Sequence, residues 1–426
     1  MTRSGEAAKA GPASGTSAMT IKTKTTKVRK RLRNIPPSLK TIRPPRVGLR
    51  HSTGMTSIWL DEIPPDVHPP LDEDTSADVA IVGAGIAGVA TAYNVSRSGA
   101  KVVVLEARTV AEAASGRNAG FLLAGVAENF VAAARRYGED RALRTWRFTR
   151  HNQELVRAIV ERERIACDLA WNGSSQIAGD DEEWAEVRAS AERLTKEGVR
   201  VRLTPESRAA IYQEDGELHP VRYVRALADA AVAGGTRIHD GTRAIAVSKG
   251  EVRTERARVR AGAVVVCVNA YSQHLVPLRV RPVRGQMLAT APVARRVFER
   301  PAYANRGYRY WRQRTDGSLL VGGWRDTAAD EEVGEEERTT PRIQQRLEGF
   351  LREHCADATV THRWAGTMGF SHDALPYVGP LSNGVFVNAG FTGHGMAFAT
   401  ATGELVADLL RGTKRSETDL FAPERP

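Results

Sequence analysis

Two short apolar runs, at residues 79–82 and 102–105, open the clearest pattern in the chain. The first run is followed by closely spaced glycines and then by a longer, mostly apolar stretch that reaches about Ser98. Short β-branched runs bounded by turn residues are typical of buried strands, whereas the longer stretch has the length of a helix. The pattern predicts a strand, a glycine turn, a helix and a second strand.

Three further segments carry helical signals. Residues 126–170 repeat apolar positions at helical spacing among many Arg and Glu residues, and residues 182–197 have the composition of a surface helix. Residues 219–235 have a proline near the first turn and two glycines at the end, which is the usual asymmetry of a helix. We predict helices in all three.

The second half of the chain is dominated by strand signals. Residues 263–271 form an apolar run that suits a strand buried on both faces. Residues 277–370 predict mostly strands, with one helix near 342–354, and residues 385–411 predict a strand, a glycine loop and a helix. Strand–helix units at both ends, with antiparallel-looking strands between them, predict one discontinuous domain interrupted by another.

The positive charge of the chain is concentrated at its start. The formal net charge is +11, yet residues 1–50 contain 13 Lys/Arg and one acid, Glu6, so the remainder carries −1. This composition predicts a basic disordered tail over residues 1–54. We interpret it as a solvated extension, or as an early start upstream of Met55; a targeting peptide or a nucleic-acid-binding arm is the alternative.

Cysteine spacing and apolar run length exclude several classes of protein. Cys167, Cys267 and Cys355 are too widely spaced for a disulfide framework or a zinc site, so we predict no metal and a reducing, cytoplasmic setting. The longest stretch of small apolar residues, 79–92, is too short to span a bilayer. No integral membrane contact is predicted, and the near-neutral body makes nucleic acid an unlikely partner.

A glycine turn between strand and helix predicts a dinucleotide site. Gly83, Gly85 and Gly88 have the spacing GxGxxG, in which the glycines allow a tight turn, close approach to a pyrophosphate and close helix–strand packing. Glu106, 18 residues beyond Gly88, ends the second strand and is positioned to accept hydrogen bonds from ribose hydroxyls. An acid here favours FAD or NAD over NADP.

A polar loop after the second strand favours FAD over NAD, because FAD needs binding groups well beyond its adenosine. The loop residues that we expect to bind it are Ala114, Ser115, Gly116, Arg117 and Asn118.

The chain resembles the FAD-dependent D-amino-acid-oxidase-like (DAO family) amine oxidoreductases, and in particular their gamma-glutamylputrescine-oxidase-like branch. The resemblance covers roughly Ser57 to Gly412. Beyond the glycine turn and its acid, it is carried by the motifs SIWLDEIPP, SGRNAGF, VNAYSQHLVP, RPVRGQML, YRYWRQRTDGSLLVGG, HDALPYVGP and GFTGHGM.

The resemblance implies an α/β (α+β overall) architecture with a discontinuous Rossmann-like FAD-binding domain and an antiparallel-sheet substrate domain. We place the FAD-binding domain at residues 55–128, 200–280 and 361–426, and the substrate-binding domain at 129–199 and 281–360. The FAD is expected to be non-covalent, because no cysteine lies in a matching attachment motif and Cys267 lies inside an apolar strand.

The GFTGHGM loop raises the question of a catalytic histidine. Its position before a predicted helix instead suggests backbone N–H groups that stabilise negative charge on a reduced flavin, with the histidine secondary. The cofactor-binding residues predicted here are Gly390, Thr392, Gly393, His394, Gly395 and Met396.

The strand YRYWRQR supplies the substrate-binding candidates. Alternate residues of a strand share a face, so Tyr310, Arg312 and Arg314 are predicted to point the same way and to form a carboxylate clamp with an aromatic wall. Arg312 and Arg314 both remain candidates for the substrate anion, and Gln286 is expected to reach the flavin or the substrate.

The resemblance implies oxidation of a C–N bond in an amine or amino acid, such as a gamma-glutamyl amine carrying a carboxylate, by hydride transfer to flavin N5. With O2 as acceptor the second product is H2O2. One alternative is a dehydrogenase that passes electrons to a carrier. The other is a non-enzymatic nucleotide-binding protein whose basic tail binds nucleic acid.

Overall fold

The computed structural model describes residues 56–425, which belong to one compact unit. The predicted basic tail (1–54) and Met55 lie outside the described residues. Among the described residues, none of the helices is long and apolar enough to cross a membrane.

The first sheet contains the strands that frame the glycine turn. In spatial order they are β17 (Tyr377–Pro380), β18 (Phe386–Ala389), β11 (Arg258–Val266), β1 (Thr75–Val82), β2 (Val102–Leu105) and β8 (Arg237–His239). The run from β18 to β8 is parallel, and β17 pairs antiparallel with β18. Strands β10 (Glu251–Thr254) and β9 (Ala244–Ser248) extend from β11 as an antiparallel hairpin.

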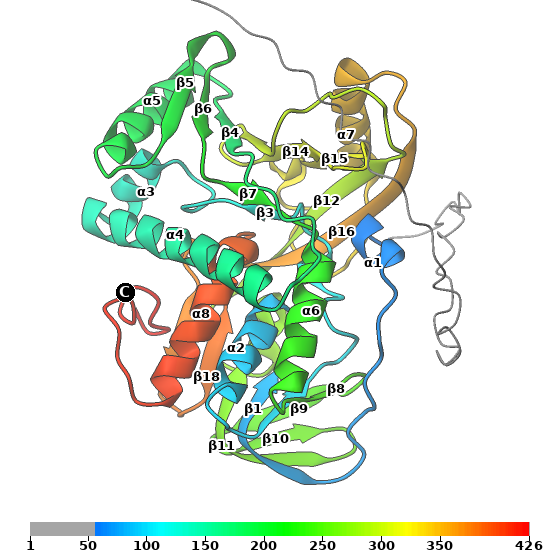
Figure 1. The fold of residues 1–426 in the computed structure, drawn as a ribbon, viewed down its shortest axis with the longest axis vertical. Coiled ribbons are helices and arrows are strands. Elements are labelled where there is room, and N and C mark those ends of the chain that lie inside the picture. Colours follow the sequence, from blue (N-terminus) through cyan, green and yellow to red (C-terminus); the bar gives the residue numbers. More distant parts are fainter. Residues whose placement is uncertain (1–55, 426) are drawn as a thin grey trace, which may run out of the picture. The chain divides into compact units, whose positions relative to one another are not determined.

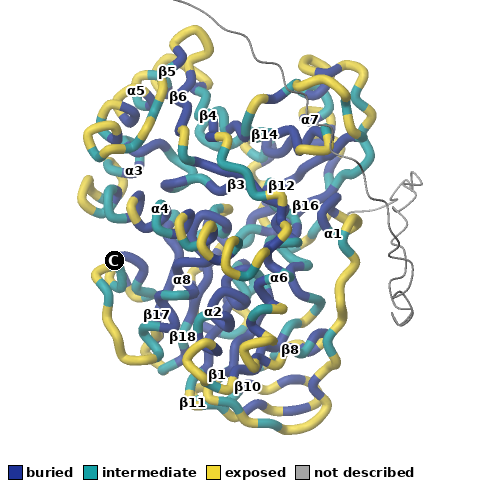
Figure 2. Tube along the Cα trace, viewed as in Figure 1, coloured by how far each residue is buried: buried dark blue, intermediate teal, exposed yellow. Residues whose placement is uncertain are grey.

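Both faces of this sheet are buried. On β1, Val79 and Ile81 pack under helices, whereas Ala80 and Val82 pack in a second apolar cluster on the opposite face. The covering helices, seen side by side in the lower half of Figure 1, are α2 (Ile86–Ser96), α6 (Pro220–Ala233) and α8 (Gly395–Leu410). Helix α4 (Glu139–Arg162) packs against α8, and Figure 2 shows α2 and α8 buried over most of their length.

The second sheet is antiparallel except where β13 meets β4. Its strands, in spatial order, are β16 (Val360–Phe370), β12 (Arg281–Thr290), β15 (Leu319–Gly323), β14 (Arg309–Gln313), β13 (Ala302–Ala304), β4 (Ser174–Ile177), β6 (Ala209–Tyr212) and β5 (Val201–Thr204). Helices α3 (Phe130–Tyr137) and α5 (Asp181–Thr195) pack at one end, and α7 (Pro341–His354) packs at the other.

Sheet membership differs from the predicted domain boundaries at two places. Strands β5 and β6 lie in the segment assigned to the FAD-binding domain, yet β6 pairs with β4 of the second sheet. Strand β16 also belongs to the second sheet, because it pairs with β12 along almost its whole length. These pairings join segments distant in sequence, so local patterns gave no sign of them.

The predicted fold class is confirmed, and most local predictions match the observed elements. The helical segment 126–170 is divided between α3 and α4 at Gly138, and the apolar run 263–271 leaves the sheet after Val266. Three small elements complete the fold near the loop 114–118. Helix α1 (Ile58–Glu62) packs beside that loop, and β3 (Phe121–Leu122) pairs with β7 (Gly216–Glu217) after it.

Candidate active site

A cavity of about 740 Å³ begins at the carboxyl ends of the parallel strands and reaches the second sheet. This is the edge where open α/β sheets bind their ligands. Val82 of β1, Leu105 of β2 and Cys267 after β11 line one end, and Tyr310 of β14 and Met368 of β16 line the other.

The glycine turn is built around close backbone contacts. Gly83 has φ +102°, and a β-carbon there would lie 2.8 Å from the carbonyl oxygen of Cys267. A β-carbon at Gly88, which lies in α2 outside the cavity lining, would lie 1.8 Å from the carbonyl oxygen of Gly83. Gly85 precedes the first residue of α2 and lines the cavity, so the amino end of this helix faces the space where a pyrophosphate would bind.

Glu106 is fixed at the end of β2 by two backbone hydrogen bonds. Its Oε2 accepts from the N–H of Ala84 at 2.7 Å, and its Oε1 accepts from the N–H of Arg108 at 2.8 Å. Burial raises the pKa of this carboxyl, although both hydrogen bonds favour the ionised form. Each oxygen keeps a lone pair for a ribose hydroxyl, and Glu106 lines the cavity.

The loop 114–118 is held in place by its own polar side chains. Asn118 donates to the carbonyl oxygens of Ala114 and Ser115 and accepts from the N–H of Gly120 at 2.8 Å. Arg117 donates to the carbonyl oxygen of Ala365 in β16 at 3.2 Å, which links the loop to the second sheet. These loop residues line the cavity apart from Gly116, which packs against the carbonyl oxygen of Ala111.

The loop before α8 and the first residues of that helix border the cavity on another side. The cavity-lining residues here are Thr392, Gly393 and His394 of the loop and Gly395 and Met396 of α8. Gly390 lies behind them, where its N–H donates to Asn269 Oδ1 at 3.0 Å.

His394 immediately precedes α8, and its Nδ1 lies 3.3 Å from the carbonyl oxygen of Thr392. Burial lowers the pKa of His394 to about 4, and Arg325 adds to the effect. The imidazole is therefore neutral at physiological pH, which suits a hydrogen-bonding role better than a proton-transfer role.

The end of the cavity beside the second sheet is aromatic and contains two residues that sequence analysis missed, Tyr303 and Arg325. Tyr303 and Tyr310 pack with ring centroids 5.7 Å apart. Burial raises the pKa of Tyr310 to about 12 and also raises that of Tyr303, so both phenols stay protonated. Arg325 lines the same region and stacks on Tyr308 and Phe370, at 4.3 and 5.0 Å from the ring centroids.

Most other arginines near the cavity form hydrogen bonds or ion pairs, whereas Arg325 contacts aromatic rings. Among residues 56–425 its guanidinium has these ring contacts but no hydrogen bond or ion pair. It begins a short 3-10 turn directly after Trp324, whose φ is +59°. Because this irregular turn follows the strand β15, no periodic pattern marked Arg325. The sequence signal was an arginine after a Gly-Gly-Trp strand end.

Of the four residues predicted to contact the substrate, the structure places Tyr310 in the cavity and the other three outside its lining. Gln286 is buried, and it donates to Glu332 and Thr340 and accepts from the N–H of Thr340. Its amide therefore forms hydrogen bonds to the segment between β15 and α7, and it does not reach the cavity.

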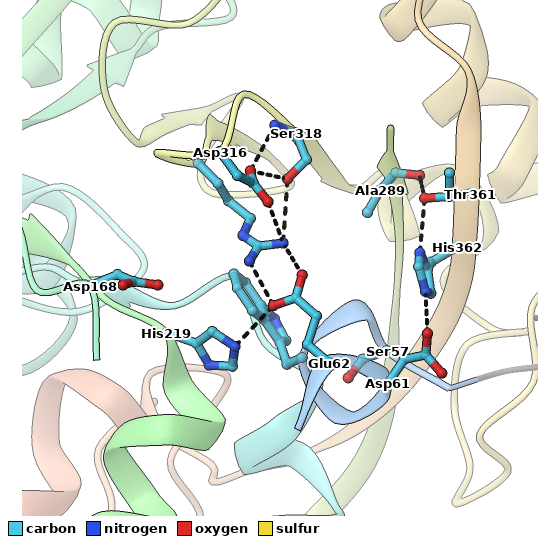
Figure 3. Close-up of polar contacts among 12 residues, drawn as sticks. Ser57, Asp61, Glu62, Asp168, His219, Ala289, Asp316, Ser318, Thr361 and His362 are labelled. Atoms are coloured by element: carbon cyan, nitrogen blue, oxygen red, sulfur yellow. Dashed lines mark hydrogen bonds and ion pairs between the residues drawn. The ribbon is translucent and has the colours of Figure 1, made fainter. Parts of the chain in front are cut away.

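Arg312 and Arg314 share a face of the chain with Tyr310, but α1 covers that face where they lie. Both guanidinium groups stack on Trp59, at 5.5 and 4.8 Å. Arg314 donates to both oxygens of Glu62, at 2.6 and 2.7 Å, and Figure 3 shows His219 reaching the same carboxylate. These bonds lower the pKa of Glu62 to about 2 despite its burial.

Arg312 is more deeply buried than Arg314 and has more hydrogen-bond partners on the backbone. Its NH1 donates to the carbonyl oxygens of Ala119, Gly120 and Leu218 at 3.0–3.1 Å, and its Nε lies 2.9 Å from Oε2 of Glu217. Only 3% of Arg312 is exposed. The two arginines thus hold α1 and the strand β7 against the loop 114–120 rather than facing the cavity.

The residues present fit an FAD. The glycine turn, Glu106 and the loop 114–118 form a continuous cradle, and a β-carbon at Gly85 would lie 3.0 Å from Ser115 Oγ within it. Among the described residues, no group of His, Cys, Asp and Glu side chains is arranged to hold a metal ion.

Known proteins are similar to this chain in sequence and in fold. Gamma-glutamylputrescine oxidoreductase of Escherichia coli K12 is 26% identical over 369 residues, covering 80% of this chain and 85% of that protein. Glycine oxidase of Geobacillus kaustophilus is 28% identical over 375 residues, covering 80% and 94%. Its solved structure has a TM-score of 0.71 at 23% identity, covering 82% of this chain and 99% of that one.

A second solved structure, L-proline dehydrogenase from P. horikoshii, has a TM-score of 0.69 at 20% identity and covers 83% of this chain and 98% of that one. The family model for FAD-dependent oxidoreductases (DAO) matches residues 78–409, which span most of the chain. The protein is therefore a member of the DAO family of FAD-dependent oxidoreductases, with FAD as its cofactor.

Proposed function

We propose that this enzyme oxidises a C–N bond in an amine or amino acid that carries a carboxylate, with gamma-glutamyl amines as a candidate class. The observation that carries the proposal is Arg325, a cation without an anionic partner among the described residues, at the aromatic end of the FAD cavity. A substrate carboxylate would supply that partner through paired hydrogen bonds. The names of the relatives, which include a gamma-glutamylputrescine oxidoreductase and glycine oxidases, support the substrate class.

The protein's part in such a reaction is to orient the substrate and keep water away. When bound, FAD supplies the acceptor for the hydride that leaves the carbon next to the amine nitrogen. Arg325 would fix the carboxylate end, and the protonated phenols of Tyr303 and Tyr310 would form the wall beside the reacting carbon. His394, being neutral, would accept a hydrogen bond from the substrate nitrogen without adding a positive charge beside it.

We further propose O2 as the electron acceptor, so that the amine loses two electrons and two protons and O2 becomes H2O2. The imine product is then hydrolysed by water to a carbonyl compound and an amine or ammonia. Turnover in air should yield one H2O2 per substrate consumed. Turnover only with an added electron carrier, and no peroxide, would instead identify a dehydrogenase.

The substrate class can be tested by mixing the holoenzyme anaerobically with a panel of amines and following loss of flavin absorbance. We expect bleaching by carboxylate-bearing amines, including gamma-glutamyl amines, and little by amines without a carboxylate. Bleaching by D-amino acids alone would remove the gamma-glutamyl class. Bleaching by neutral amines alone would remove the carboxylate from the proposal.

Arg325→Ala is expected to raise KM for a carboxylate-bearing substrate about ten- to a hundredfold, because a hydrogen bond to a charged group contributes about 1.5–3 kcal/mol. KM for the matching substrate amide should change little. The control is Arg296→Ala, which removes an exposed arginine bonded to the carbonyl oxygen of Glu299. Equal effects on acid and amide would exclude Arg325 as the anion site.

We also propose a cytoplasmic setting. Cys167, Cys267 and Cys355 are all free and buried, as expected of a protein that works in a reducing compartment.

A further inference from the structure

A strongly acidic loop connects the second sheet to the FAD-binding residues. We call residues 330–338 the acidic loop; it lies between the short turn that contains Arg325 and the helix α7, and its sequence is DEEVGEEER. Exposed acidic loops are commonly solvated surface, so its contacts decide whether it has a role.

The near end of the acidic loop is fixed to β12 by a buried ion pair. Arg284 donates through Nε and NH2 to the two oxygens of Glu332, both at 3.1 Å, and the two side chains are 2% and 1% exposed. The same guanidinium donates to the carbonyl oxygens of Glu331 and Glu336, at 2.6 and 3.2 Å. Gln286 adds a hydrogen bond to Glu332 at 2.9 Å. This end of the loop therefore has a defined position on the second sheet.

The far end reaches residues that line the FAD cavity. Glu337 lies 2.8 Å from Arg108 NH1 and 3.4 Å from Arg117 NH2, and it accepts from the Tyr271 hydroxyl at 3.5 Å. Arg108 follows Glu106 at the end of β2, Arg117 belongs to the loop 114–118, and Tyr271 belongs to the short helix after β11. All three line the cavity.

A second ion pair also joins the acidic loop to the residues around the cavity. Glu335 lines the cavity and lies 2.7 and 3.0 Å, through its two oxygens, from Nε2 of His274. This pair is more exposed than the Glu337 cluster, because 59% of the His274 side chain is accessible whereas 14% of Glu337 is. Glu337 is therefore the principal attachment of the acidic loop to the FAD-binding residues.

We propose that Glu337 is a positioning residue that retains FAD by latching the acidic loop across the cavity. One carboxylate holds three cavity-lining side chains from three separate segments, and Arg284 anchors the other end of the same loop. Release of FAD then requires the Glu337 contacts to break. The proposal concerns only the bound cofactor, so its failure would leave the substrate assignment unaffected.

The test is the rate of FAD dissociation from the holoenzyme after dilution, followed by the fluorescence of released flavin. We expect Glu337→Gln to release FAD at least about tenfold faster than the unaltered protein at low salt. Raising the salt concentration should accelerate release from the unaltered protein, because screening weakens the ion pairs, and should change release from Glu337→Gln much less.

The matched control is Glu336→Gln, which removes the same charge from the adjacent position. The carboxylate of Glu336 is 73% exposed and pairs with Arg338 in the same loop, so its loss should leave the FAD release rate unchanged.

Two results would overturn the latch. Equal acceleration by Glu336→Gln would show a general charge effect of the loop. Unchanged or slower release from Glu337→Gln would show that Arg108 and Arg117, freed from the carboxylate, bind the cofactor better than the closed loop retains it. Thermal unfolding of the apoprotein, expected to be similar in both variants, separates either result from a loss of folding.

Discussion

Arg312→Met is expected to lower the stability of the protein by about 3–5 kcal/mol, which is the usual cost of removing one partner of a buried ion pair. Arg312 is 3% exposed and donates to three carbonyl oxygens, and Glu217, which is equally buried, lies beside it. Methionine fills similar space but leaves Oε2 of Glu217 and the carbonyl oxygens of Ala119 and Leu218 without a donor. The measurement is the midpoint of urea unfolding at fixed FAD concentration.

The matched second variant is Arg312→Met combined with Glu217→Gln. Removing the stranded carboxylate should recover part of the lost stability, because an uncompensated buried charge costs more than a neutral amide. The single variant, where it folds, should keep the preference for carboxylate-bearing substrates. An unchanged unfolding midpoint together with a selective rise in KM for anionic substrates would instead place Arg312 at the substrate, as the strand pattern alone suggested.

The contrast between Arg312 and Arg325 shows what the sequence was able to predict. Strand alternation indicated that Tyr310, Arg312 and Arg314 share a face, and the structure agrees. Alternation carries no information about what covers that face. Trp59 and Glu62 of α1 lie about 250 residues away in sequence, and they occupy the two arginines. Of the three residues on the shared face, Tyr310 alone lines the cavity. Whether Arg312 or Arg314 could bind a substrate anion therefore depended on the position of α1, which strand alternation does not indicate.

The cofactor site was more predictable because its signals are local. The glycine turn, its acid and the helix α2 lie within one continuous segment of about thirty residues, in which spacing largely determines geometry. The loop 114–118 begins eight residues after Glu106. By contrast, Glu337 reaches Arg108 from 229 positions along the chain. The acidic sequence of residues 330–338 is typical of a solvated surface loop and gives no indication of such a contact.

Gly88→Ala should yield protein that is purified with little or no flavin. The added methyl group would lie 1.8 Å from the carbonyl oxygen of Gly83, and the two backbones around it are fixed by β1 and α2. No rotamer change relieves a clash between a β-carbon and a backbone oxygen, so the helix must move away from the turn, at a cost of about 3 kcal/mol or more. That movement displaces the amino end of α2 from the pyrophosphate position. Flavin absorbance per mole of protein measures the effect.

Alanine substitutions at two less crowded glycines serve as controls for Gly88→Ala. Gly85→Ala should retain part of its FAD, because its β-carbon would lie 3.0 Å from Ser115 Oγ, a side-chain atom that can move by a few tenths of an ångström. Gly349→Ala, in α7 with open space around it, should retain flavin fully and gain up to about 1 kcal/mol of stability from helix propensity. If Gly88→Ala kept the flavin content and unfolding midpoint of Gly349→Ala, close packing of α2 on the turn would not be what forms the pyrophosphate site. Circular dichroism of the soluble fraction distinguishes loss of flavin in a folded protein from global unfolding.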